Sequence, residues 1–365
     1  LIGEVWFAGG QSNMEMPLGG FWQCPVTDAN EIIARASAKS GKLHYVKIPH
    51  AAAYTPQDRT AGSWTPCTTA TAAKFTAAGY FFAEMLNDVL SVPVGIIDCS
   101  WGGSRVESWM SREVLSGYSD IDLTEEGISR VAQHLRPMVM YNAMLRPVAG
   151  YTVRGFLWYQ GESNVGRYMD YAARLADMVS LWRGLGAQDD LPFYYVEIAP
   201  FEYGNGKSPY LREAQCRAQE LIPNSGMICT NDLVEPYEFC NVHPKNKRDV
   251  GYRLALNKTY GMREIACQSP QYESMEIRDG KARIRFKYMD QGFNRMADIR
   301  GFEICGADKI FYPADAVVEN QFALVVSSEK VPEPVAVRYC FRDFQPGNLA
   351  DTRELPVVPF RTDDF

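Results

Sequence analysis

The sequence predicts an α/β domain built on a parallel sheet, followed by a smaller antiparallel β domain. Over the first two thirds of the chain, short apolar runs alternate with amphipathic stretches, the pattern of βα units that form a parallel sheet. Beyond about residue 267, short segments of alternating polarity are separated by turn residues, and no helix is indicated. We therefore expect a first domain over residues 1–268 and a sandwich-like β domain over residues 269–365.

Each expected element follows from its local pattern. Short apolar runs predict strands, and apolar residues spaced three and four apart predict helices. In the first domain, the expected strands are residues 5–8, 43–48, 92–98, 153–159, 192–198 and 226–230, and the expected helices are residues 75–89, 168–183, 210–221 and 247–260. The last of these helices is expected to end over residues 257–261, which close on a glycine. In the second domain, the expected strands are residues 281–286, 301–305, 323–327 and 335–340.

Composition excludes several classes of protein. With 365 residues and 46% hydrophobic content, the chain buries a large core rather than staying disordered. The net charge is −7 and there is no block of Lys or Arg, so we expect no nucleic-acid partner. No apolar stretch approaches the ~20 residues that span a bilayer. The chain begins at Leu1 without an initiator Met or signal peptide, which indicates a processed or trimmed product.

The nine cysteines form no C-x-x-C pair, which argues against zinc sites and against a dense disulfide framework. Their odd number leaves at least one thiol free. Several lie in apolar runs, as Cys99 does, where a small buried side chain is the expected role.

The first strand leads into a serine. The apolar run ends at Gly9 and Gly10, and Ser12 follows between the side-chain amides of Gln11 and Asn13. Glycine tolerates a tight backbone, and the start of a following helix leaves free N–H groups that bind an anion. Ser12 is therefore a candidate nucleophile, although it also suits the N-cap of an ordinary strand-to-helix turn.

A serine hydroxyl needs a base, usually a histidine. Of the four histidines, His44 lies in an expected strand and His134 in an expected helix, which favours structural roles. His50 has nothing polar beside it in the sequence. His243 stands on a polar loop just before a helix, and such loops often carry catalytic side chains. His243 is therefore the candidate base for Ser12.

A glycine pair follows the third expected strand. Without a Cβ, Gly102 or Gly103 can turn its N–H toward an oxyanion. The alternative interpretation is a plain Gly-Gly turn.

Polar side chains also follow the strand at residues 153–159. Gln160 and Asn164 are candidate oxyanion donors, and the carboxylate of Glu162 is suited to orienting an imidazole. Alternatively, this segment is a helix start that is capped by Ser163 or Asn164.

Four segments together resemble the blocks of a known family. Residues 10–14 (GQSNM), 101–109 (WGGSRVESW), 158–164 (WYQGESN) and 242–255 (VHPKNKRDVGYRLA) resemble the sialate O-acetylesterase family of SGNH (GDSL-like) hydrolases, which is related to carbohydrate acetylesterases. The resemblance implies a flavodoxin-like, three-layer α/β/α hydrolase domain that removes acetyl groups from carbohydrate without a metal or organic cofactor. O-acetylated sialic acid is the first substrate candidate and acetylated xylan the alternative. It also implies a secreted, periplasmic or lysosomal location.

The resemblance assigns roles to the site residues. It implies that Ser12 attacks the acetyl carbonyl and that His243 acts as general base and then general acid. The oxyanion would be held by the N–H groups of Ser12 and Gly103 and by a side-chain amide, for which Gln160 is the first choice and Asn164 the second.

The acidic partner of His243 is less well defined. Related acetylesterases use the glutamate that corresponds to Glu162. Many SGNH enzymes instead place an Asp three residues before the histidine, and here Cys240, a poor acceptor, occupies that position. Asp232, Glu238 and a plain Ser–His dyad are the alternatives.

Four residues are candidate substrate contacts. A tryptophan stacks well on a sugar ring, and an arginine binds a carboxylate through two hydrogen bonds. Trp22, Trp101 and Trp109 are suited to such stacking, with core packing as the alternative role, and a salt bridge is the alternative role for Arg105. The candidate contacts are Gln11, Asn13, Trp101 and Arg105.

The alternative function, from another class of protein, is a carbohydrate-binding protein whose catalytic site has decayed.

Overall fold

The computed structural model describes residues 2–186, 190–257 and 265–365. The chain divides into two compact units. The first unit contains Leu1–Ile198, Ala214–Ile228 and His243–Tyr260, and the second contains Ala199–Glu213, Cys229–Val242 and Gly261–Phe365. The α/β domain with a parallel sheet and the antiparallel β domain are both confirmed. The helix end expected over residues 257–261 lies largely outside the described residues.

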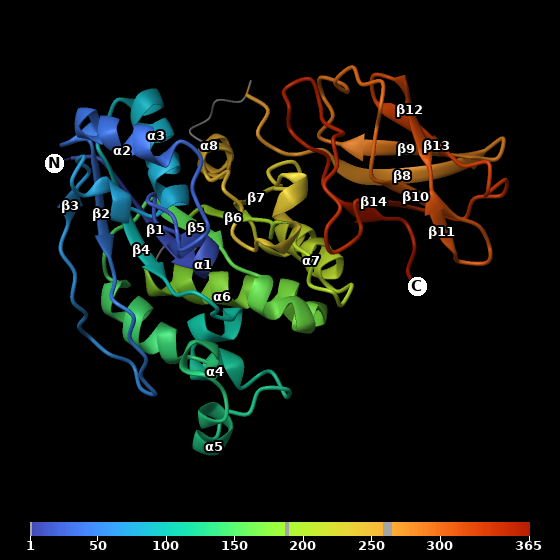
Figure 1. Ribbon diagram of the computed structural model, residues 1–365. Helices are drawn as coiled ribbons and strands as arrows, with labels where there is room; N and C mark the ends of the chain where they lie inside the picture. Colours follow the sequence, from blue (N-terminus) through green and yellow to red (C-terminus); the bar gives the residue numbers. More distant parts are fainter. Residues whose placement is uncertain (1, 187–189, 258–264) are drawn as a thin grey trace. The chain divides into compact units, whose positions relative to one another are not determined.

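The first unit is built on a seven-stranded sheet with strand order β3-β2-β4-β1-β5-β6-β7 (Figure 1). All neighbouring strands run parallel except β2 and β3. The expected strands of this unit were therefore placed correctly, apart from small differences at their ends. The strands are β1 (Glu4–Gly10), β2 (Leu43–Lys47), β3 (Thr65–Pro66), β4 (Val94–Ser100), β5 (Gly155–Tyr159), β6 (Phe193–Val196) and β7 (Ser225–Ile228).

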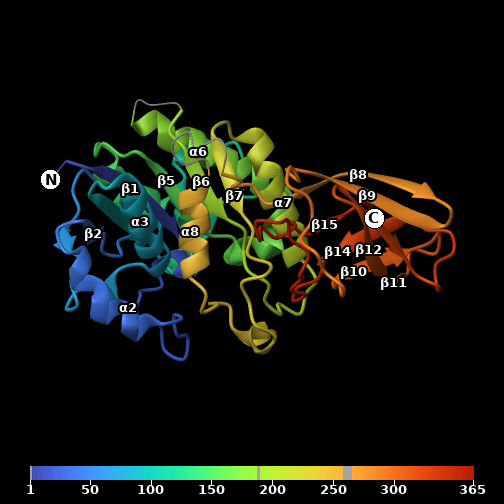
Figure 2. The same cartoon turned by 90° about the horizontal axis from the view of Figure 1, so that it is seen from above.

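Helices cover both faces of this sheet (Figures 1 and 2). Successive side chains of a strand point to opposite faces, so Trp6 contacts Phe82 of α3 (ring centroids 4.9 Å apart) and Phe7 contacts Trp182 of α6 (5.3 Å). The result is a three-layer α/β/α core. The helices are α1 (Ser12–Glu15), α2 (Ala29–Arg35), α3 (Ala77–Leu90), α4 (Arg112–Leu115), α5 (Glu125–Ser129), α6 (Tyr171–Leu185), α8 (Arg248–Leu256) and α7 (Ser208–Leu221), which has residues in both units.

The register of the three central strands brings distant segments to one edge. Gly10 at the end of β1 pairs with Ser100 of β4 on one side and Tyr159 of β5 on the other. The loops after these strands therefore start at the same level of the sheet. Gly10 has a φ of 139°, and a Cβ there would lie 2.2 Å from the carbonyl oxygen of Tyr159. Only glycine fits this close approach, and α1 begins directly after it at Ser12.

The second unit contains two four-stranded sheets, ordered β11-β10-β14-β15 and β12-β13-β9-β8, with antiparallel pairing throughout. Its core draws on both sheets: Ile284 and Leu324 from one and Ile304 and Val337 from the other are fully buried. This is the arrangement of a sandwich. The strands are β8 (Gln271–Arg278), β9 (Lys281–Lys287), β10 (Phe302–Cys305), β11 (Phe311–Pro313), β12 (Asp315–Asn320), β13 (Ala323–Ser327), β14 (Ala336–Tyr339) and β15 (Phe360–Arg361).

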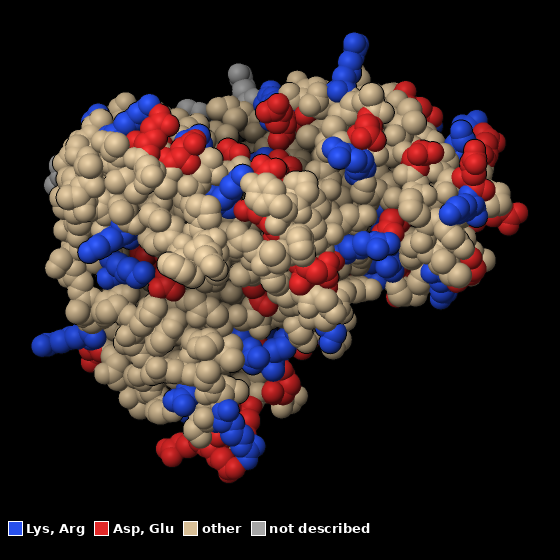
Figure 3. All heavy atoms as spheres, in the orientation of Figure 1, with Lys and Arg blue, Asp and Glu red and all other residues tan. Residues whose placement is uncertain are grey.

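Surface charge, helix hydropathy and cysteine chemistry add three facts. On the face shown in Figure 3, acidic and basic side chains are interspersed and neither sign forms a continuous patch. Among the described helices, none combines the length and the apolar character that crossing a membrane requires. Within the described residues, the nine cysteines form no disulfide, and Cys99 is fully buried as expected.

Candidate active site

Ser12 is half-buried at the first position of α1. Within the described residues, its hydroxyl has no hydrogen-bond partner and its backbone N–H has no acceptor. The loop after β4 lies directly beside it, since a Cβ on Gly102 would be 3.3 Å from Ser12 Cβ. Ser12 therefore has a hydroxyl and a backbone N–H at the same place, and neither is used in a hydrogen bond to another described residue.

The glycine pair offers one free donor rather than two. The N–H of Gly102 donates to Glu15 Oε2 at 2.7 Å, whereas the N–H of Gly103 has no acceptor in the described part of the chain. Gly103 has a φ of 75°, and a Cβ there would lie 2.9 Å from His134 Cδ2. Position 103 therefore requires glycine, and of the two N–H groups only that of Gly103 is available to an oxyanion.

The two amides of the third segment are not equivalent. The Gln160 side-chain nitrogen donates to the Ser104 carbonyl oxygen (3.1 Å) and to Asn164 Oδ1 (2.7 Å), and Gln160 Oε1 accepts the Tyr171 hydroxyl (2.9 Å). Both N–H groups of Gln160 are thus used within the protein. Asn164 Nδ2 donates one N–H to Glu107 (2.9 Å), and its second N–H has no acceptor among the described residues. Both amides are fully buried, and the difference between them is the unused N–H of Asn164, which favours Asn164, the second choice, over Gln160.

Gln11 connects two of the segments instead of facing a substrate. Its side chain is 3% exposed, and Oε1 accepts the N–H groups of Gly161 and Ser163, both at 3.3 Å. The Ser163 hydroxyl in turn donates to the Gly103 carbonyl oxygen (2.8 Å). These bonds fix the loops after β1, β4 and β5 to one another.

Asn13 is equally committed. It is 1% exposed, its Oδ1 accepts Lys247 Nζ and its Nδ2 donates to Glu162 Oε1, both at 2.6 Å. The structure therefore places neither Gln11 nor Asn13 where a substrate reaches the side chain, because both amides are buried and bonded within the protein.

His243 lies against the segment that follows Ser12. Its ring centroid is 5.3 Å from that of Phe21, and its Nδ1 is 3.8 Å from Cys24 Sγ. Four residues later, Lys247 reaches Asn13, the neighbour of Ser12. The structure thus brings the loop of His243 to the turn of Ser12. Burial, together with the positive charge of Lys247, lowers the pKa of His243 from 6.5 to about 4.

The structure does not join Glu162 to His243 by a hydrogen bond. The Glu162 Oε1 atom is bonded to Asn13, and its Oε2 atom is buried without a partner among the described residues. Burial raises the pKa of Glu162, while the hydrogen bond from Asn13 and the charge of Lys247 act in the opposite direction. Glu162 therefore belongs to a buried group with Asn13 and Lys247.

The other acidic candidates, Asp232 and Glu238, are part of the second unit. The Glu238 carboxylate accepts the N–H of Glu235 at 2.9 Å, in the capping box of a short 3₁₀ turn over Pro236–Cys240. The Cys240 side chain, three residues before His243, is exposed.

Sequence reasoning missed a group beside the glycine pair. Glu15 accepts His50 Nε2 at 2.7 Å, and the His50 ring stacks on Trp101 with centroids 4.4 Å apart. Burial acts to raise the pKa of Glu15, but the hydrogen bond from His50 and the charge of Lys47 bring it below its ordinary value. The residues beside His50 in the sequence are apolar, and its polar partner Glu15 lies 35 residues away, so no local signal indicates the contact.

His134 also lies beside the glycine pair. It lies in a short 3₁₀ helix over Gln133–Leu135, as the expected helix allows, and its ring lies beside Gly103. No pattern in the surrounding sequence indicates this contact.

The candidate substrate contacts differ in their exposure. Trp109 is fully buried and donates to Ser104 Oγ at 3.0 Å, so it is a core residue, whereas Trp22 is 88% exposed. Trp101 and Arg105 are half-buried. Arg105 makes no ion pair within the described residues, its Nε is buried without a partner, and burial lowers its pKa. Arg105 is therefore a cation with no counter-ion in direct contact among the described residues.

Comparison with known proteins gives consistent matches. Residues 3–259 match the family model described as carbohydrate esterase, sialic acid-specific acetylesterase. Sialate O-acetylesterase of Mus musculus is 26% identical over 365 residues, covering 85% of this chain and 66% of that protein. The Homo sapiens protein is 27% identical over 336 residues, covering 84% and 63%. The chain thus spans about two thirds of the length of these curated relatives. A solved carbohydrate acetylesterase from Xanthomonas citri is similar over 100% of this chain and 82% of its own, with 34% identity and a TM-score of 0.88.

Proposed function

We propose, since this chain belongs to the carbohydrate esterase family of sialic acid-specific acetylesterases, that it is a serine esterase that removes O-acetyl groups from carbohydrate. One observation carries the proposal. The half-buried Ser12 lies against the glycine loop at Gly102, and the backbone N–H groups of Ser12 and Gly103 have no acceptor in the described part of the protein. Donors held in place without an acceptor are what an oxyanion intermediate requires.

In the proposed reaction, Ser12 Oγ attacks the acetyl carbonyl carbon while His243 takes the hydroxyl proton. The carbonyl oxygen becomes an oxyanion that accepts from the N–H groups of Ser12 and Gly103 and from Asn164 Nδ2. When the C–O bond to the sugar breaks, His243 returns the proton to the leaving sugar oxygen. His243 then activates a water molecule, which attacks the acetyl-enzyme and releases acetate and free Ser12.

Glu162 serves this site through its neighbours. Its carboxylate balances the buried charge of Lys247, and Asn13 bonds to both groups. Asn13 follows Ser12 in the sequence, and Lys247 follows the loop of His243. These contacts therefore hold the segment of the nucleophile against the segment of the base. We propose that Glu162 acts in this way rather than as the direct partner of the imidazole.

O-acetylated sialic acid is the substrate that we propose, with acetylated xylan as the alternative. Sialic acid carries a carboxylate, and xylan's backbone sugar does not. The half-buried Arg105, two residues after Gly103 and without a protein ion pair in the described residues, has the chemistry to bind that carboxylate. A secreted, periplasmic or lysosomal location goes with this proposal.

The substrate is tested by replacing the arginine. We expect Arg105→Met to lower kcat/KM for O-acetylated sialic acid by about 10- to 150-fold, because a hydrogen bond to a charged group contributes about 1.5–3 kcal/mol. Hydrolysis of an aryl acetate, which has no carboxylate, should change little. Acetate release is measured for both substrates and for acetylated xylan. The control variant is Arg35→Met, because Arg35 is exposed. Trp109 is not suitable for a control because it lies in the core.

Two results would contradict this assignment. If wild-type protein hydrolyses acetylated xylan faster than O-acetylated sialic acid, the alternative substrate is correct. If Arg105→Met lowers all three rates equally, Arg105 does not recognise a carboxylate.

The pH dependence follows from the lowered pKa of His243. An imidazole is a base only when it is neutral, so a pKa of about 4 keeps it active at every pH above that value. We expect kcat/KM to stay level as the pH falls through about 6.5, the usual value for histidine, and to decrease only near pH 4. The measurement is kcat/KM for an aryl acetate over the range from about pH 3 to about pH 8.

A charge variant tests the cause of this shift. Removing the positive charge in Lys247→Met should raise the pKa of His243 and move the acid limb to higher pH, while the exposed Lys74→Met should leave it in place. A wild-type limb near 6.5 would show that the imidazole that controls the rate is not in the buried environment of His243.

A further inference from the structure

A buried carboxylate lies behind the oxyanion site. Glu107 follows the glycine loop, in the 3₁₀ turn Val106–Trp109, and is 4% exposed. Its Oε2 accepts Asn164 Nδ2 at 2.9 Å. Its Oε1 accepts Arg167 Nε at 3.1 Å and is also bonded to Arg174 Nη1. Three donors therefore converge on the two oxygens of a single carboxylate.

This carboxylate determines which way the Asn164 amide faces. Asn164 Oδ1 accepts the Val106 N–H at 3.1 Å and Gln160 Nε2 at 2.7 Å, and Asn164 Nδ2 faces Glu107. A carboxylate is only an acceptor, so the flipped amide would set oxygen against oxygen at Glu107 and nitrogen against two donors. The orientation with Nδ2 toward Glu107 is the one in which every contact pairs a donor with an acceptor.

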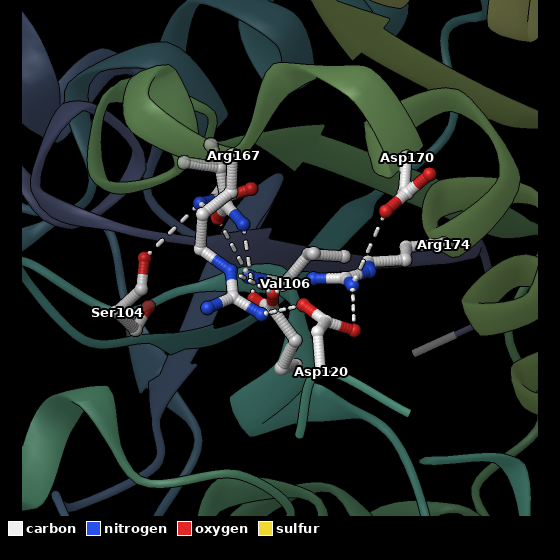
Figure 4. Close-up of polar contacts among 9 residues, drawn as sticks. Ser104, Val106, Asp120, Arg167, Asp170 and Arg174 are labelled. Atoms are coloured by element: carbon white, nitrogen blue, oxygen red, sulfur yellow. Dashed lines mark hydrogen bonds and ion pairs between the residues drawn. The ribbon is translucent and has the colours of Figure 1, made fainter. Parts of the chain in front are cut away.

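Two arginines compensate the charge of Glu107. Arg174 is 1% exposed and Arg167 is half-buried, and both also bind Asp120, with Arg174 Nη2 at 2.6 Å from Asp120 Oδ1. Figure 4 shows the Asp120 carboxylate between the two guanidinium groups. The arginines balance the negative charge of Glu107. Glu107 can therefore accept a hydrogen bond from Asn164, a proposed oxyanion donor, without strongly opposing the oxyanion that forms on the other side of that amide.

We propose that Glu107 is a positioning residue for the oxyanion hole, which acts through Asn164 by fixing the orientation of its side-chain amide. This inference rests on the proposed function, since it assigns the third oxyanion donor to Asn164. Glu107 touches no reacting atom, and its contribution reaches the reaction only through the N–H of Asn164 that does not bond to Glu107.

The test is a double-mutant cycle between Glu107→Gln and Asn164→Ala, measured on the full chain with an aryl acetate. An amide at position 107 meets three donors with a single oxygen, so it turns an NH₂ group toward one of them. We expect Glu107→Gln to lower kcat by about 10- to 1,000-fold, up to the loss of one oxyanion donor, with KM within about twofold. In the Asn164→Ala background, the same change should alter kcat by less than about twofold.

Two further variants complete the design. Asp170→Asn makes the same acid-to-amide change in an exposed residue that lies 3.7 Å from Arg174 and contacts neither Glu107 nor Asn164, so its kcat should match wild type. Glu107→Asp keeps the charge that the arginines need and is used if Glu107→Gln does not yield folded protein. Its shorter side chain should lower kcat in the same way, again only when Asn164 is present.

The outcomes separate this inference from the proposed function. If the wild-type chain releases no acetate, the esterase proposal fails. If the wild type is active and Glu107→Gln keeps its kcat, or if Glu107→Gln costs the same factor with and without Asn164, the positioning role is overturned while the esterase stands. A cycle in which the loss disappears with Asn164 supports it.

Discussion

Replacing Ser12 by alanine is expected to lower kcat for acetate release by about 10⁴- to 10⁶-fold, because a catalytic serine and its base act as a unit. Since Ser12 Oγ forms no hydrogen bond within the described residues, removing it breaks none there. The melting temperature should therefore stay close to that of the wild type. Acetate release and thermal unfolding, measured on the same preparation, separate the loss of the nucleophile from a loss of folded protein.

The matched control is Ser163→Ala. Ser163 is also half-buried in the same group of loops, but its hydroxyl donates to the Gly103 carbonyl oxygen. Its removal should cost far less activity than the removal of Ser12, and it should lower the melting temperature. Equal rates for wild type and Ser12→Ala, or a larger loss for Ser163→Ala, would remove Ser12 from the mechanism.

Replacing His243 by alanine is expected to cost nearly as much as the loss of Ser12, about 10⁴- to 10⁶-fold in kcat. The serine hydroxyl is a weak nucleophile until a base takes its proton. In the double variant Ser12→Ala/His243→Ala, the rate should be no lower than in either single variant, because each removal already disables the pair. The measurement is kcat for an aryl acetate in the two single variants and the double variant.

The other two histidines near the glycine loop provide the controls. His50 bonds to Glu15 and stacks on Trp101, and His134 lies beside Gly103. Alanine at either position should reduce kcat far less than alanine at position 243. If His50→Ala or His134→Ala abolishes activity while His243→Ala retains it, the base has been assigned to the wrong imidazole.

Much of the fold could be predicted from local patterns. The strands that became β1, β4 and β5 are short apolar runs with turn residues after them, and a parallel sheet brings their carboxyl ends to one edge. The loop after each strand therefore enters the site, and its residues are adjacent in the sequence to the strand that carries it. For this reason local patterns could single out Ser12, the glycine pair and the segment after β5 as candidate site residues, and the structure brings these three loops together.

The commitments of individual polar groups could not be predicted. Gly102 and Gly103 are neighbours of the same type, yet only Gly102 donates to a carboxylate, and that carboxylate belongs to Glu15, 87 residues away. Gln160 and Asn164 are both buried amides, yet the Gln160 side chain donates both of its N–H groups, to Ser104 and to Asn164. The neighbouring residues in the sequence do not indicate which acceptors these groups meet after folding.

The sequence by itself determined the α/β architecture, the antiparallel β domain and the residues that the loops carry to the edge of the sheet, because hydrophobic periodicity and turn chemistry act over a few neighbouring residues. Only the tertiary structure decided which donors remain free for a substrate, that Glu162 bonds to Asn13, and that Glu107 stands behind Asn164. A buried donor or acceptor is satisfied by whatever group packs against it, and those groups come from segments up to 234 residues apart, as Asn13 and Lys247 do.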